Sequence, residues 1–191
     1  MALSDSDLVS IKTRLNLTSE PFRVITANEM LATVNSPTLA VVGTSPDGAV
    51  AWAMDGAGAD EEIGGVIIRV PGDISASDFT LDFDILCATS VAGAGSEDVV
   101  LDVGLATIAS GDLIDEARAL VGAITTDVSA KGVDEFFIVT FSPATTYAAG
   151  DYLRLSVRRN SGDGSDDYGS DMYILGVVCL YWHKSLQEFA Q

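Results

Sequence analysis

Apolar and polar residues alternate with a period of two in several short segments of this 191-residue chain. The clearest segment runs from Phe79 to Cys87, where every second residue is apolar and Asp82 and Asp84 lie between them. Successive side chains of a β-strand point to opposite faces of a sheet, so this pattern predicts strands with one buried and one solvated face. No other feature of the sequence constrains the fold as strongly.

Turns rich in Gly, Asp and Ser separate these segments, and no regular alternation of strands with helices is present. We therefore predict an all-β fold, an antiparallel β-sandwich that is jelly-roll-like at this length. Residues 112–128 fit either a helix or a strand, and we expect a short helical or irregular turn that leads into a strand. About eight strands are expected, at residues 38–43, 49–54, 63–70, 79–87, 99–105, 136–141, 152–157 and 172–182.

The first 36 residues have a different character from the rest of the chain. Residues 4–17 can form a short helix with one apolar face, and Thr26 and Glu29 have the spacing of a capping box. Because this segment has short features and few core residues, we expect residues 1–36 to be an N-terminal arm or anchor. Residues 37–191 would then be the β-sandwich domain.

The predicted strand at residues 172–182 is apolar on both faces, and residues 136–141 are similar. A two-layer sandwich covers only one face of each sheet, and exposed apolar patches of this kind are rare on monomers. A homo-oligomer, with a trimer preferred, or cover by the first 36 residues would bury the second face. The residues expected at this packing or oligomer interface are Tyr173, Leu175, Val177, Cys179, Tyr181, Phe137, Val139 and Phe141.

The charge balance excludes two classes of partner. The 28 acidic and 10 basic residues give a net charge of −18. Such a chain lacks the basic patches that bind nucleic acid, and it would be repelled by an anionic membrane surface. Neither an export signal nor an apolar run long enough to span a membrane is visible. The two cysteines lie in apolar runs and are interpreted as buried free thiols, with a disulfide between them as the alternative.

The C-terminal third resembles a known group of proteins. Residues 150–159 read GDYLRLSVRR, an acidic turn with Asp166, Asp167 and Tyr168 follows, and residues 175–181 read LGVVCLY. This layout, together with RVPGD at residues 69–73, resembles β-sandwich proteins of tailed-virus particles over residues 48–184. The resemblance implies a head-decoration, head-fibre or tail-fibre protein of bacteriophage type that is not an enzyme and assembles as a trimer.

On this resemblance we expect a structural virion protein, a capsid decoration (cement) protein that stabilises the head shell. Its partners would be itself and the major capsid protein or another virion protein, and the arm would contact the shell. Its location would be the virion, assembled in the host cytoplasm. A tail-fibre receptor-binding domain is the nearest variant.

Few residues suggest site chemistry, and no cofactor is expected. The only histidine, His183, ends the last predicted strand, and no zinc, P-loop or GxSxG motif is present. The acidic loop at residues 160–171 supplies the oxygen ligands that calcium prefers, although solvated turns explain its composition as well. A calcium-dependent carbohydrate-binding module is therefore the alternative function. Its expected calcium ligands are Asp163, Asp166, Asp167 and Asp171, and its expected sugar-stacking residues are Trp52, Tyr168, Tyr173 and Trp182.

Overall fold

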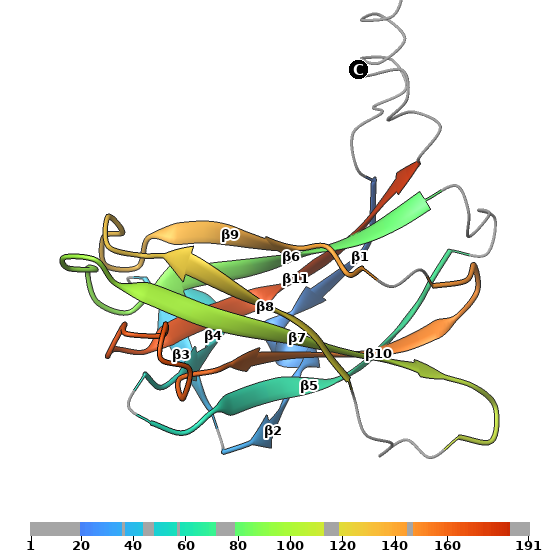
Figure 1. Ribbon diagram of the computed structural model, residues 1–191, viewed down its shortest axis with the longest axis horizontal. Helices are drawn as coiled ribbons and strands as arrows, with labels where there is room; N and C mark the ends of the chain where they lie inside the picture. The colour runs from blue at the N-terminus through green and yellow to red at the C-terminus, as the bar shows by residue number, and fades with distance from the viewer. Residues whose placement is uncertain are drawn as a thin grey trace, which may run out of the picture.

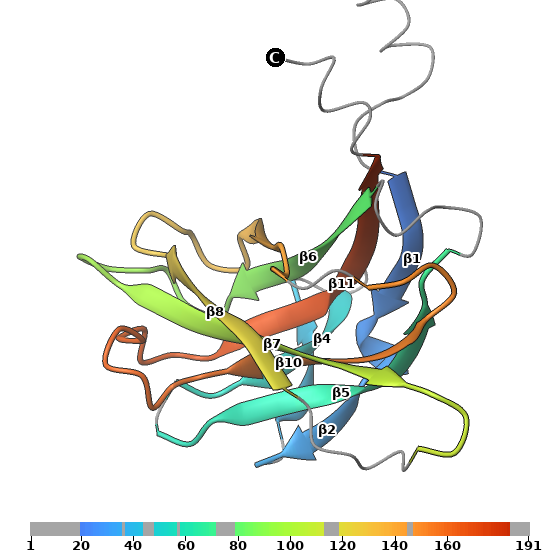
Figure 2. The same cartoon turned by 45° about the vertical axis from the view of Figure 1, so that its right-hand side comes forward.

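The computed structural model describes residues 20–35, 37–43, 48–56, 58–71, 79–112, 119–144 and 147–183. These residues form two antiparallel sheets that pack face to face, as Figures 1 and 2 show from two directions. The elements are β1 (Glu20–Thr26), the 3-10 turn η1 (Ala27–Glu29), β2 (Leu31–Val34), β3 (Thr38–Val42), β4 (Ala49–Met54), β5 (Glu61–Arg69), β6 (Phe79–Thr89), β7 (Asp98–Ile108), β8 (Ala119–Asp127), β9 (Phe136–Phe141), β10 (Tyr152–Arg159) and β11 (Met172–His183).

The order of the strands is that of a jelly roll. Sheet A contains β4-β11-β6-β9 and sheet B contains β5-β10-β7-β8, so the chain crosses between the sheets at each of several successive strands. Every strand pair is antiparallel. The predicted fold class is therefore confirmed, and the ambiguous segment does lead into a strand, β8.

The remaining three strands extend the two sheets. β3 lies beside β4, β2 lies beside β5, and β1 pairs with the second half of β11. The structure thus contains eleven described strands where about eight were expected, because β1 and β2 were assigned to the arm and β8 was ambiguous. The predicted boundary near Pro37 falls between two strands of the same sandwich. Residues 1–19, with the predicted helix at 4–17, lie outside the described part.

A single turn connects β1 to β2 and fixes both to the sandwich. The predicted capping box is confirmed, since the N–H of Thr26 donates to the carboxylate of Glu29 at 2.9 Å. Trp52 of β4 donates its indole N–H to the carbonyl of Ala27 at 2.8 Å, and Ile25 and Met30 are buried in the core. The segment from 20 to 34 is consequently part of the domain rather than a separate arm.

The core lies between the sheets and follows the predicted alternation. Phe83, Ile85 and Cys87 of β6 face Leu153, Leu155 and Val157 of β10, and all six side chains are fully buried. Burial of a large apolar side chain contributes about 1.5–3 kcal/mol. No helix of the described residues is long and apolar enough to cross a membrane.

β11 departs from the strict alternation that the sequence predicted. The register against β6 shifts between Ile174 and Gly176, which is a β-bulge, and the bulge exchanges the two faces of the strand. Tyr173 and Leu175 therefore lie half-buried on the outer face of sheet A. Val177 and Cys179 belong to the core, so the predicted common face for these four residues is wrong.

Three of the other predicted interface residues also lie in the core. Phe137, Val139 and Phe141 of β9 point into the core of the same chain. The side chain of Tyr181 lies outside the described part. On the outer face, Tyr173 and Leu175 pack against three buried residues of the same sheet, which are Val42, Ala51 and Ala88. The second face of β11 is thus partly covered within one chain.

Candidate functional site

The outer face of sheet B is built around β10, whose sequence alternates between the core and the surface. Leu153, Leu155 and Val157 point into the core. Tyr152, Arg154, Ser156 and Arg158 therefore point outward, because they are the intervening residues of the strand. Six residue steps of about 3.3 Å make this column of outward side chains about 20 Å long. We call these four residues the β10 column.

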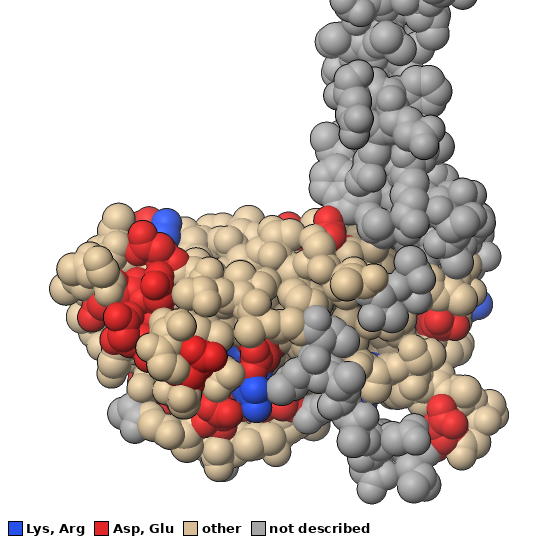
Figure 3. Space-filling model, viewed as in Figure 1, with Lys and Arg blue, Asp and Glu red and all other residues tan. Residues whose placement is uncertain are grey.

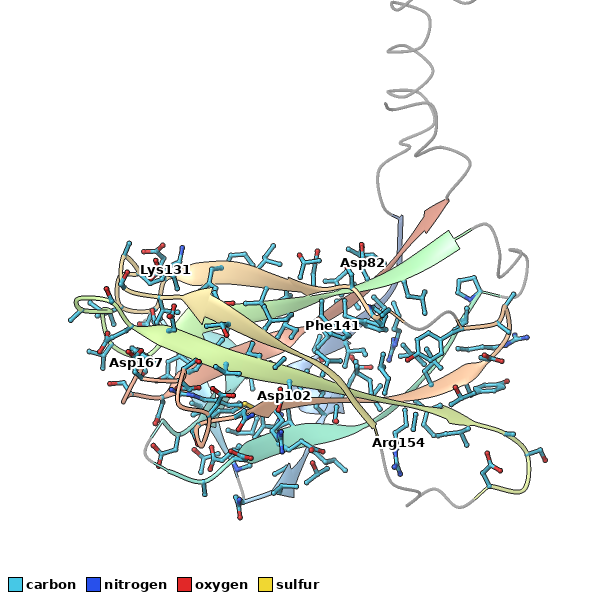
Figure 4. All side chains as sticks on the ribbon, viewed as in Figure 1. Asp82, Asp102, Lys131, Phe141, Arg154 and Asp167 are labelled. Atoms are coloured by element: carbon cyan, nitrogen blue, oxygen red, sulfur yellow. The ribbon has the colours of Figure 1, made fainter. Side chains whose placement is uncertain are left out.

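Each residue of the β10 column lies in a row between one residue of β5 and one residue of β7. In the first row Tyr152 lies between Arg69 of β5 and Ile108 of β7. In the second row Arg154 lies between Ile67 and Ala106. Figure 4 labels Arg154 on the far side of β10 from Phe141, which lies between the sheets. This end of the face is therefore aromatic, basic and partly apolar.

The third row contains only small residues. Ser156 lies between Gly64 of β5 and Gly104 of β7. The register between β10 and β5 shifts at Ser156, and the register between β7 and β8 shifts at Gly104. All three residues are buried, so this row itself is not open to a ligand.

The fourth row holds charged side chains in fixed positions. Arg158 donates from Nε to the carboxylate of Asp102 at 2.9 Å, and its guanidinium also pairs with Asp60 at 3.2 Å. On the other side, Glu62 accepts a hydrogen bond from the hydroxyl of Thr33 at 2.9 Å. A guanidinium held by two carboxylates keeps one orientation, so this row presents donors and acceptors in a preorganised arrangement.

Ser156 lies at the centre of this arrangement and its hydroxyl is unsatisfied. The residue is 1% exposed, and its Oγ has no hydrogen-bond partner among the described residues. A buried hydroxyl without a partner costs about 1–3 kcal/mol. Tyr152, the first residue of the β10 column, is 50% exposed, and the guanidinium of Arg69 lies 5.8 Å from the centre of the Tyr152 ring.

The acidic loop is organised mainly by a buried arginine. Arg159 is completely buried, and its Nε and Nη2 donate to the two carboxylate oxygens of Asp166 at 3.1 and 2.8 Å. The same guanidinium donates to the carbonyls of Met54, Ser170 and Tyr168. One arginine thereby joins the end of β4 to the loop between β10 and β11.

The four predicted calcium ligands do not converge in the structure. Asp166 is paired with Arg159 and also accepts from the N–H of Val100 at 3.0 Å. Asp167 accepts from the N–H of Asp98 at 2.6 Å, and Asp163 accepts from the N–H of Ser165 at 2.9 Å. Within the described residues, no three His, Cys, Asp or Glu side chains are arranged to hold a metal ion, and Asp171 joins no such group.

The predicted sugar-stacking aromatics are mostly inside the molecule. Trp52 and Tyr168 belong to the core, and the hydroxyl of Tyr168 donates to the carbonyl of Val91 at 2.7 Å. Tyr173 is half-buried on sheet A, and burial raises the pKa of its hydroxyl. The side chains of Trp182 and His183 lie outside the described part. The exposed aromatic of sheet B, Tyr152, was not among the predicted residues.

Both cysteines are buried free thiols, which confirms the sequence interpretation. Burial raises the pKa of Cys87 and raises that of Cys179 to about 12. Because the thiolate is the reactive form, neither cysteine is suited to act as a nucleophile or metal ligand.

Charged residues are concentrated at one end of the molecule. Figure 3 shows acidic side chains at the end where the β6–β7, β8–β9 and β10–β11 loops meet, near Asp167 and Lys131 in Figure 4. A broad surface over β8 and β9 has few charges in the same view. The β10 column is thus separate from the densest part of the acidic surface.

No family model and no curated protein matches the sequence. Among solved structures, an arabinose-bound α-L-arabinofuranosidase, MgGH51, aligns with 83% of this chain at 14% identity and a TM-score of 0.47, and the chain spans 24% of that protein. The CBM36-1 domain of a multidomain xylanase from the hindgut metagenome of Trinervitermes trinervoides aligns over 83% of this chain and 94% of its own, at 10% identity and a TM-score of 0.43.

A xylan-binding domain of CBM 22 aligns over 83% of this chain and 93% of its own, at 12% identity and a TM-score of 0.44. Likenesses at this level carry no argument about activity or ligand. The β-sandwich class rests on the strand order itself, and the function has to be argued from the side chains on its surface.

Proposed function

We propose that this protein is a non-catalytic binding module that takes a neutral, extended carbohydrate on the outer face of sheet B. The exposed ring of Tyr152, on the same outward column as the fixed guanidinium of Arg158, is the observation that carries the proposal. Ser156 between them is buried, so its hydroxyl is not counted as a ligand contact.

The other residues of the face suit the same class of ligand. Sugars carry many hydroxyl groups that both donate and accept, so they match a surface that offers guanidinium donors and carboxylate acceptors together. Arg158 is already paired with Asp102 and Asp60, so its charge is balanced and a neutral ligand is favoured over an anionic one. The exposed ring of Tyr152 offers an apolar surface for the C–H face of a sugar ring.

The virion hypothesis rested on the resemblance of the C-terminal third. The oligomer expected with it was to cover the second apolar face of the last strand, and the structure accounts for that face in another way. In the structure the bulge of β11 directs Val177 and Cys179 into the core, and residues of the same chain partly cover Tyr173 and Leu175. Capsid decoration and the virion location remain predictions, and carbohydrate binding has the more specific structural support.

The proposal is tested by affinity electrophoresis in gels that contain xylan or β-1,3-glucan, together with a glycan array. Retardation in at least one gel is expected for the wild-type protein. Tyr152→Ala removes the stacking surface and is expected to weaken binding about threefold to tenfold.

Leu39→Ala provides the matched control, because Leu39 is 55% exposed on sheet A, far from β10 in strand order. This variant is expected to bind as the wild type does. Ser156→Ala, which removes a buried hydroxyl, is also expected to bind as the wild type does. Absence of binding to every glycan, or wild-type affinity in Tyr152→Ala, would exclude this function.

A further inference from the structure

The edge of sheet A at β9 has the properties of a strand that pairs with another strand. β9 is the last strand of the sheet, and β6 is its only ladder partner among the described strands. One side of an edge strand presents unpaired N–H and C=O groups in the spacing that fits another β-strand. Proteins usually protect such an edge with a lysine, a proline or a bulge.

None of these protecting features is present within β9. Its six residues are Phe-Phe-Ile-Val-Thr-Phe, and its register with β6 is continuous from Phe136 to Phe141. Two of the three outward side chains are apolar and accessible, because Phe136 is 54% exposed and Ile138 is 49% exposed, and the third is Thr140. By contrast β2, at one edge of sheet B, has four residues and a register shift.

We propose that β9 pairs with β9 of a second copy of this chain, antiparallel and centred on Ile138, so that sheet A continues through the dimer. In this register Phe136 lies opposite Thr140 of the second copy, and the outward residues of both copies fall on the same face of the joined sheet. The contact is self-complementary, as a two-fold symmetric interface requires.

The distribution of charge restricts where two copies can meet, and β9 satisfies this restriction. The chain has a net charge of −18, so two copies can approach only where carboxylates do not face each other. Asp134 and Glu135 precede β9, and the antiparallel register places them opposite Ser142 and Phe141 of the second copy. Glu135 is in addition paired with Lys131 at 3.3 Å.

Next to the proposed contact, β6 places Leu86 and Ala88 opposite the outward residues Ile138 and Phe136. Leu86 lies opposite Ile138 on β6, and Asp84 lies opposite Thr140 and accepts a hydrogen bond from its hydroxyl at 2.6 Å. Pairing would therefore extend an apolar strip from Leu86 through Ile138 to the same residues of the second copy. A contact of six residues per strand is small, so the dimer is expected to be concentration-dependent.

Cysteine cross-linking tests the register directly. In Ile138→Cys the two new thiols would face each other across the two-fold axis, at the separation of opposed residues in an antiparallel pair, which a disulfide can bridge. Mild oxidation is expected to give a covalent dimer. Cys87 and Cys179 do not interfere, because both are buried. Leu39→Cys, on the opposite edge strand β3, is expected to remain monomeric.

Light scattering after size-exclusion chromatography provides the second measurement. The wild-type mass is expected to rise towards twice the monomer mass with concentration, and Ile138→Lys is expected to raise the dissociation constant at least tenfold. Leu39→Lys should leave it unchanged, and circular dichroism should show that both variants fold. A wild-type monomer at all concentrations up to about 0.5 mM, or cross-linking of Leu39→Cys in place of Ile138→Cys, overturns the proposal.

Discussion

At the scale of single residues, Arg159 does more to fix the loops than any other side chain of the described part. It is fully buried, it forms a bidentate ion pair with Asp166, and its guanidinium lies 5.5 Å from the ring centre of Tyr168. A buried charge is costly unless it is paired and its donors are satisfied, and here both conditions are met. The acidic loop is therefore a structural connection tied to the core.

Removal of one partner of this pair should destabilise the protein strongly. Asp166→Asn leaves the charge of Arg159 buried without its counter-charge, and we expect a loss of about 3–5 kcal/mol in the free energy of unfolding. Asp163→Asn removes the same charge from the same loop, but Asn can still accept from the N–H of Ser165. Urea unfolding should show the large loss in the first variant alone, and equal losses would contradict the buried-pair interpretation.

At the scale of strands, the alternating pattern predicted most of the sandwich but not the places where the pattern changes phase. Residues 79–87 and 152–157 became β6 and β10 with the expected faces buried. The faces of β11 were wrong beyond residue 175, because a bulge is fixed by neighbouring strands and leaves no mark in the hydrophobic pattern. β1 and β2 were missed because their strand structure depends on tertiary pairing with β11 and β5.

The candidate site was missed for a related reason. The alternation in residues 152–158 predicts an outward polar column, but such a column is ordinary for a solvated sheet face. Its special feature is the grouping of Tyr152 with Arg69 of β5 and of Arg158 with Asp102 of β7, which comes from three strands far apart in the sequence. Only the strand order brings these residues together, and single-sequence periodicity contains no information about strand order.

Gly176 marks the bulge of β11 and should be sensitive to substitution. A Cβ at this position would lie 2.2 Å from the carbonyl oxygen of Ile25, so β1 or β11 would have to move. We expect Gly176→Ala to cost at least about 1–3 kcal/mol in the free energy of unfolding. The separation of β1 from β11 should also appear as faster amide hydrogen exchange in residues 20–26.

Gly164→Ala is the matched control for this strand-level prediction. Gly164 lies in the loop between β10 and β11, and an added Cβ there would meet nothing within 4 Å. Its stability should be unchanged or slightly raised, because alanine reduces the conformational entropy of the unfolded chain. If Gly176→Ala were equally neutral, the close approach of β1 to β11 would not exist in solution.

At the scale of the whole molecule, the net charge of −18 acts against the compact state. Many acidic side chains gather at the end where three loops meet, as Figure 3 shows, and few basic residues are present to balance them. Repulsion between like charges is relieved when the chain unfolds and the charges separate. The local hydrogen bonds of Asp127 and Glu135, which lower the pKa of each, do not remove this long-range repulsion.

Salt should therefore stabilise the protein at neutral pH. Raising NaCl from 0.01 M to 1 M shortens the Debye length from about 30 Å to about 3 Å, which screens the repulsion across the molecule. We expect the melting temperature at pH 7 to rise by several degrees, and calorimetry would measure this directly. Near pH 4, close to the sequence pI of 4.1, the net charge is small and the same salt step should have much less effect.

A melting temperature that is flat or falls with salt at pH 7 would show that the excess acidic charge does not destabilise this fold. Equal responses at the two pH values would assign the salt effect to the hydrophobic core instead.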